Sequence, residues 1–239
     1  TAWHKAVNIP AEVHLGFLGR TFDVHWDRHA MLMSLVWLVL VPVAILAVRY
    51  FKPAPTPYGI DRGTGRFDRR LVWWTVHWVA MYAAIGLALV ATAVALVASG
   101  GFSGSVHGFL GLATIALGAL QIGSAWLRGP HGGKHGIHSD PAVPATWRGD
   151  HYDMTARRRW FEAYHKTMGH ATLALALCAA VTGLMQFWLP WLAVPAIGGG
   201  ALCLLLCVLF ERRGMRQDTY RSVYGDHPLH PYNRERAPR

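Results

Sequence analysis

The sequence predicts an all-α integral membrane protein with a four-helix transmembrane core and a fifth, C-terminal transmembrane helix. Of its 239 residues, 53% are hydrophobic and only 15% are charged, and the apolar residues gather in long blocks. A segment that crosses the roughly 30 Å of membrane hydrocarbon must satisfy its backbone internally, as a helix does. Five blocks are long enough, and we expect spans at residues 31–50, 72–99, 106–127, 167–188 and 191–210.

The distribution of charge predicts the orientation. The net charge is +10, yet the N-terminal segment contributes only Lys5, Arg20 and Arg28, and every other basic residue lies at the end of span one, three or five or in the segment that follows it. The positive-inside rule assigns such segments to the cytoplasm. We therefore expect a multi-pass protein of the bacterial inner (cytoplasmic) membrane, with its N-terminus outside and its C-terminus cytoplasmic. This one-sided pattern argues against nucleic-acid binding.

The N-terminal residues 1–24 are expected to form an external segment. Thr21 is a candidate N-cap with Asp23 in the first turn, so the first helix would start about two turns before the hydrocarbon. This start would place His29 within the helix rather than at a frayed end.

Proline and glycine mark the loops. The prolines between Lys52 and Gly59 end the first helix, and Pro190 joins spans four and five. The segment 128–164 is the largest internal loop. Its His131, His135, His138 and Asp140 resemble a metal cluster, although the glycines and charges around them favour a solvated loop. The predicted parts are an external segment (1–24), a core (25–190), a fifth transmembrane helix (191–211) and a cytoplasmic basic tail (212–239), extended or partner-bound.

One histidine stands at the start of each of the first four spans. From His29, His77, His107 and His165 to the end of the span is 20 to 24 residues, or roughly 30–36 Å of helix. Because successive spans run in opposite directions, His29 and His107 would share one level of the membrane, and His77 and His165 the other. Two pairs of imidazoles inside a helical bundle suggest two bis-histidine haems b, with these four residues as ligands of the haem iron.

Other assignments remain open. A single such histidine would be read as a capping or interfacial side chain, but four at equivalent depth indicate function. His25 competes with His29 because it lies four residues earlier on the same face, and His170 competes with His165. Gly111 and Gly169, four residues after two of the histidines, would leave clearance for a flat macrocycle.

Nearby cations are candidate partners for haem propionates. Arg28 lies near the outer level, and Arg70, Arg158 and Lys166 lie near the inner one. Ordinary positive-inside charge is the alternative explanation for most of them.

The motifs around these histidines resemble those of the cytochrome b561 superfamily, especially the bacterial, ferric-reductase-like form of its di-haem b core. They extend over about residues 25–190 and comprise His29-Ala30-Met31-Leu32-Met33 with Trp37 and Pro42, Ala47-Val48-Arg49-Tyr50-Phe51-Lys52, Trp74 with His77, His107-Gly108-Phe109-Leu110-Gly111 with Gln121, and His165-Lys166-Thr167-Met168-Gly169. The resemblance implies a four-helix core that holds two haems b, with alternate helices supplying each, and that passes electrons across the membrane.

We therefore expect a di-haem b-type cytochrome that acts as an electron-transfer component of an oxidoreductase rather than as a self-contained catalyst. Its partners would be membrane lipid, a redox protein and quinone. One alternative is the quinone-reactive membrane anchor of a respiratory dehydrogenase, of the formate dehydrogenase or hydrogenase type, bound to an iron–sulfur subunit. The other is a histidine-lined transporter without haem, although the broken helices and inverted repeats of many transporters are not evident.

Overall fold

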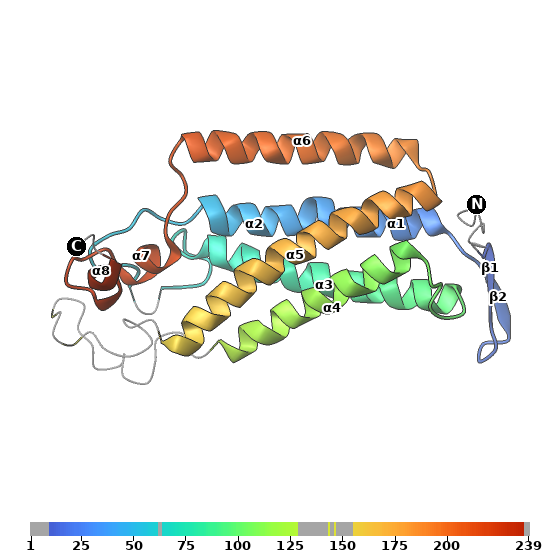
Figure 1. Ribbon diagram of the computed structural model, residues 1–239, viewed down its shortest axis with the longest axis horizontal. Coiled ribbons are helices and arrows are strands. Elements are labelled where there is room, and N and C mark those ends of the chain that lie inside the picture. The colour runs from blue at the N-terminus through green and yellow to red at the C-terminus, as the bar shows by residue number, and fades with distance from the viewer. Residues whose placement is uncertain (1–9, 62–63, 129–142, 144–145, 147–154, 237–239) are drawn as a thin grey trace. The chain divides into compact units, whose positions relative to one another are not determined.

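Five long helices dominate the computed structural model, which describes residues 10–61, 64–128, 143, 146 and 155–236 (Figure 1). Each is long and apolar enough to cross a membrane, which confirms the predicted all-α integral membrane fold. The first span, Trp26–Tyr50, consists of α1 (Trp26–Ser34), a π-helical segment η1 (Leu35–Leu40) and α2 (Val41–Tyr50). The others are α3 (Val72–Ala98), α4 (Val106–Leu127), α5 (Ala156–Gln186) and α6 (Pro190–Arg212).

A β-hairpin precedes the first span, and the sequence did not predict it. Strand β1 (Glu12–Leu15) pairs antiparallel with β2 (Arg20–Asp23). The proposed N-cap was wrong, because Thr21 belongs to β2 and α1 begins at Trp26. The indole nitrogen of Trp26 donates a 2.8 Å hydrogen bond to the carbonyl oxygen of Pro10, which ties the hairpin to the helix. His29 nevertheless lies inside α1, as expected.

The chain divides into two compact units. Unit 1 contains residues 1–42, 81–121 and 168–203, and unit 2 contains residues 43–80, 122–167 and 204–239. Unit 1 thus takes the first part of the first, third and fifth spans and the last part of the second and fourth. Unit 2 takes the complementary parts. This is the membership expected when successive spans alternate in direction.

Small residues form much of the core of unit 1. Ala84, Ala88 and Ala91 of α3 are buried, as are Ala176 and Ala179 of α5. Helices in membranes associate closely where such side chains allow their backbones to approach. The unit therefore packs its helix segments mainly through alanines.

The tail in unit 2 is folded rather than extended, which corrects the prediction. It contains α7 (Thr219–Tyr224) and α8 (Pro231–Arg236), both red in Figure 1. We call residues 218–236 the tail module. Asp218 caps α7 by accepting a 2.9 Å hydrogen bond from the backbone N–H of Arg221. The buried side chains of the module are Tyr220, Ser222, Tyr224, His230, Tyr232 and Asn233.

The loop after the first span holds the tail module. The backbone N–H of Ile60 donates a 2.9 Å hydrogen bond to the carbonyl oxygen of Val223, and that of Asp226 donates a 3.0 Å bond to the carbonyl oxygen of Thr56. Two glycines make this close approach possible. A Cβ atom on Gly59, whose φ is +72°, would overlap the backbone of Val223, and one on Gly225 would overlap that of Pro57.

Candidate functional site

The first pair of histidines, His29 and His107, lies in unit 1. Their ring centroids are 6.3 Å apart and their planes are nearly perpendicular, at 86°. His29 is in the first turns of α1, and His107 is the second residue of α4. Trp26, one turn before His29, presents its ring edge-on at 6.2 Å. The histidines at the starts of the first and third spans therefore lie close together.

The second pair, His77 and His165, lies in unit 2 and repeats this geometry. The ring centroids are again 6.3 Å apart, with an interplanar angle of 80°. Aromatic side chains flank both rings: Trp74 stacks on His77 at 5.7 Å, and Phe161 stacks on His165 at 5.2 Å. The structure therefore brings together the pairs that alternating helix direction predicted.

The spacing within each pair fits two axial ligands of one metal ion. An imidazole nitrogen binds a metal ion at about 2 Å, and the ring centroid lies roughly 1 Å behind that nitrogen. Two rings on opposite sides of one iron therefore have centroids about 6 Å apart. Both pairs have this separation.

Backbone carbonyls fix the tautomer of one ring in each pair. The Nδ1 atom of His77 donates a 3.1 Å hydrogen bond to Ala44, and that of His107 donates a 2.8 Å bond to Ala179. A carbonyl oxygen can only accept a hydrogen bond, so Nδ1 must carry the proton and Nε2 is unprotonated. This is how metal-ligating histidines are usually oriented.

The other ring of each pair has a buried Nδ1 atom. The Nδ1 atom of His29 is buried, with the backbone of Ala91 near the ring. The Nδ1 atom of His165 has no hydrogen-bond partner. Buried nitrogens without partners are unusual in a folded protein and mark a place where another group is needed.

The two rival histidines occupy exposed positions. His25 is the residue before α1 and makes no side-chain capping hydrogen bond. His170 lies one to two turns beyond His165 on α5, and its side chain is exposed. His29 and His165, by contrast, are partly buried and face other histidines.

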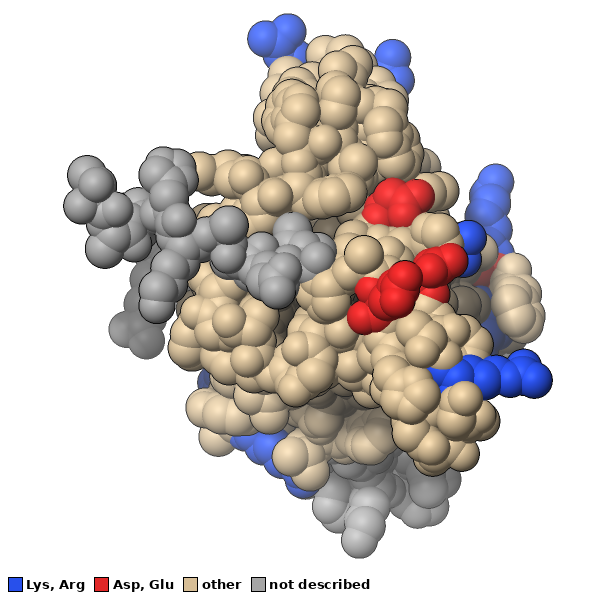
Figure 2. Space-filling view, turned by 90° about the vertical axis from the view of Figure 1, so that its right-hand side faces the viewer, with Lys and Arg blue, Asp and Glu red and all other residues tan. Residues whose placement is uncertain are grey.

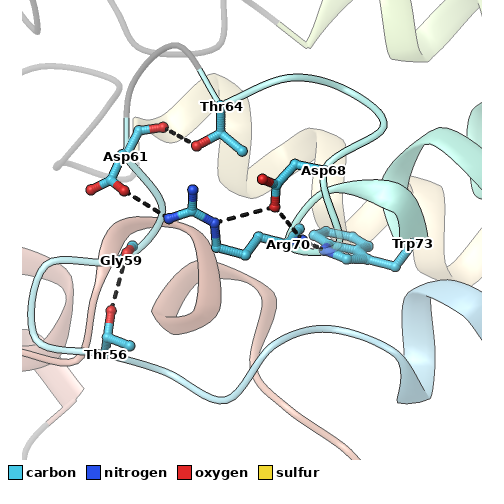
Figure 3. Close-up of polar contacts among 7 residues, drawn as sticks. All are labelled: Thr56, Gly59, Asp61, Thr64, Asp68, Arg70 and Trp73. Carbon is cyan, nitrogen blue, oxygen red and sulfur yellow. Dashed lines mark hydrogen bonds and ion pairs between the residues drawn. The ribbon is translucent and has the colours of Figure 1, made fainter.

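The predicted propionate partners differ among themselves. Arg28 is exposed. Arg70 contacts Asp61 at 2.7 Å and Asp68 at 3.2 Å, so its charge is already compensated (Figure 3). The Arg70 contacts also hold the pKa of Asp68 below its usual range, first through the backbone N–H of Arg70 and then through its guanidinium. The structure thus gives Arg70 two acidic partners in the loop, and its role toward a propionate stays a prediction.

Of the remaining two cations, Lys166 lies 3.2 Å from Glu162, one turn earlier on α5. Arg158 is different, because its Nε and Nη1 atoms are buried without a hydrogen-bond partner. Its guanidinium lies 6.0 Å from the ring centroid of Tyr224 in the tail module. Buried donor atoms without a partner are costly, so Arg158 is the predicted cation best suited to a carboxylate ligand.

Several supporting residues were missed from the sequence. Trp74 was recognised only within a motif, and Phe161 was not recognised at all. Both stand one turn before a histidine, at i−3 and i−4, and this spacing could have revealed them. The proposed His131, His135, His138 and Asp140 cluster lies outside the described residues.

Comparisons with known proteins point to a distant relation. The chain is 26% identical over 157 residues to the cytochrome b561, DM13 and DOMON domain-containing protein of Arabidopsis thaliana. The match covers 65% of this chain but only 14% of that protein's length. No protein-family model matches the chain, and no solved structure matches it. These findings support a relation to the cytochrome b561 family in general and no finer assignment.

Proposed function

We propose that this chain is a di-haem b-type cytochrome that carries electrons across the membrane between redox partners or quinone. The observation that carries this proposal is the recurrence of one geometry, two imidazoles with ring centroids 6.3 Å apart, in two separate places. A haem b held between the two imidazoles of a pair would supply one-electron transfer rather than oxygen chemistry.

The residues of the chain support each part of this role. The carbonyl oxygens of Ala44 and Ala179 orient His77 and His107 so that Nε2 is available to iron. A Cβ atom on Gly111 or Gly169 would meet no neighbouring group within 4 Å, so the chain leaves open space at both positions. The guanidinium of Arg158, whose Nε and Nη1 atoms are buried, would pair with a propionate of the haem held by His77 and His165.

The arrangement is less suited to the transporter alternative. Transient metal ligation along a transport path would call for clusters of ligating side chains at successive depths. Within the described residues, no group of three or more histidine, cysteine, aspartate or glutamate side chains is placed to hold a metal ion. Four of the described histidines of the spans, His29, His77, His107 and His165, instead form two pairs.

Haem content tests the proposal. The purified protein should show the reduced-minus-oxidised spectrum of a b-type cytochrome, with two haems per chain. His29→Ala and His77→Ala should each lower that number to about one, since each removes one ligand of a different pair. His25→Ala and His170→Ala are the matched controls and should retain two. A folded protein that binds no haem would overturn the proposal.

Whether the chain purifies together with a second protein tests what kind of partner it has. Co-purification with an iron–sulfur subunit in constant stoichiometry would identify the chain as the membrane anchor of a dehydrogenase. A di-haem protein that purifies alone and is oxidised by a quinone analogue would instead act as an independent carrier.

A further inference from the structure

A continuous stack of side chains joins a cation to the second histidine pair. The guanidinium carbon of Arg128 lies 4.8 Å from the ring centroid of Trp74. Trp74 in turn stacks on His77 with an interplanar angle of 28°. All three residues belong to unit 2, where α4 ends and α3 begins.

The ring face of Trp74 can bind the guanidinium of Arg128. Tryptophan has the most favourable aromatic face for a cation, and a guanidinium within about 6 Å of the ring centroid is attracted to it. Through Trp74, the guanidinium lies one ring away from His77, whose ring centroid is 6.3 Å from that of His165. The charge of Arg128 is therefore close enough to this pair to act on it electrostatically.

The basic residues of the chain are unevenly distributed between the two units. All lysines and arginines of the chain except Lys5, Arg20 and Arg28 belong to unit 2. In unit 1, Asp27 and Arg28 precede His29 with opposite charges. The other acidic residues of unit 1 are Glu12 and Asp23, which lie opposite each other in the hairpin. Figure 2 shows acidic atoms gathered on the side that carries the hairpin, with basic atoms beside them.

We propose that Arg128, seated on Trp74, is a positioning residue that sets the reduction potential of the His77–His165 haem above that of the His29–His107 haem. The inference rests on the proposed function. Ferric haem carries one more positive charge than ferrous haem, so a nearby cation disfavours the ferric form and raises the potential. This effect is strong where the surroundings have a low dielectric constant. At equilibrium, a single electron then resides on the His77–His165 haem.

Redox titration of purified protein that contains both haems tests the proposal. Wild type should titrate with two midpoint potentials, and Arg128→Leu should lower the higher one and leave the other unchanged. Arg128→Lys should keep the higher midpoint potential close to its wild-type value because lysine keeps the positive charge. The same titration in a His29→Ala background, where one haem remains, assigns the shifted component to the His77–His165 pair.

Arg66→Leu is the matched control, because Arg66 lies over a different tryptophan, Trp78, at 5.9 Å. Its removal should shift the potential less than the removal of Arg128 does. If Arg128→Leu lowers haem content, Trp74→Phe provides a second test, since a weaker seat for the cation should also lower the higher midpoint. Equal shifts in Arg66→Leu and Arg128→Leu, or no shift in either, would overturn the inference while leaving the haem count intact. Absence of haem from the wild type would instead refute the proposed function.

Discussion

The Nδ1 atom of His107 donates a 2.8 Å hydrogen bond to the carbonyl oxygen of Ala179. This bond joins the entrance of α4 to the last third of α5, and it requires that nothing stand between the ring and the helix backbone. Gly183, one turn after Ala179, meets that requirement. A Cβ atom on Gly183 would lie 2.9 Å from the Cε1 atom of His107 and 3.0 Å from Nδ1.

Gly183→Ala should therefore disturb the first pair and spare the second. The added methyl group must displace the imidazole or open the hydrogen bond, and a ligand out of place by about 1 Å no longer fits its metal. We expect haem content to fall from two per chain toward one. Gly198→Ala in α6, where a Cβ atom meets nothing within 4 Å, is the control and should retain both haems. Equal haem content in the two variants would contradict the positioning role of Gly183.

Arg158 and Arg70 should behave differently when truncated. Arg158→Ala removes two buried donor atoms, Nε and Nη1, that have no hydrogen-bond partner, so we expect weaker retention of the His77–His165 haem during purification. Arg70→Ala breaks exposed contacts with Asp61 and Asp68, and exposed ion pairs contribute about 0–1 kcal/mol each. Its haem content should equal that of the wild type. Haem loss in Arg70→Ala with full retention in Arg158→Ala would reverse these assignments.

The tail module should loosen at acidic pH. Burial, and to a smaller extent the neighbouring His227, lowers the pKa of His230 from 6.5 to about 4. In the folded module the Nδ1 atom of His230 accepts a hydrogen bond from the backbone N–H of Tyr232, which requires Nδ1 to be unprotonated. Because the unfolded module binds a proton more tightly, its stability is full above about pH 6.5 and falls as the pH drops toward 4.

Hydrogen exchange across residues 219–236, corrected for the intrinsic effect of pH, measures this loss. Protection should decrease between pH 7 and pH 5 in the wild type. His230→Gln, which cannot titrate, should show a flat profile over the same range. A wild-type profile as flat as that of the variant would rule out His230 as the cause.

Gly59→Ala should release the tail module without affecting haem content. The left-handed conformation of this residue costs an alanine about 1–2 kcal/mol, and the new Cβ atom also overlaps the backbone of Val223. Proteolysis within residues 213–236 should become faster. Gly65→Ala provides a loop control, since a Cβ atom there meets nothing within 4 Å. Equal proteolysis rates in the two variants would show that the loop does not hold the tail.

The sequence was sufficient to predict the spans and the histidine pairing because both depend on simple periodic constraints. Hydrocarbon thickness sets the length of a span, and alternating direction decides which entrance residues meet. The folded tail was missed because its buried tyrosines are spread over residues 220–232 of a polar segment. Their packing also depends on the close approach of the loop, which requires glycine at positions 59 and 225.

The hairpin was missed for a related reason. Thr21 and Asp23 have the composition of a helix start, but local preferences at N-caps are weak compared with strand pairing. Because Glu12–Leu15 pairs with Arg20–Asp23, the backbone N–H and C=O groups of these residues make their hydrogen bonds in the hairpin rather than in a helix. Likewise, Arg70 and Arg158 could not be distinguished from the sequence, because the contacts of Arg70 with Asp61 and Asp68 are evident only in the folded chain.

The pairing of the histidines is the central claim, and haem content in double alanine variants tests it most directly. If His29 and His107 hold one haem, the double variant of this pair should retain about one haem per chain, no less than either single variant. The double variant of His29 and His77 should retain none, because it removes a ligand from each pair. If the first double variant lost both haems, or the second retained one, the pairing would be wrong.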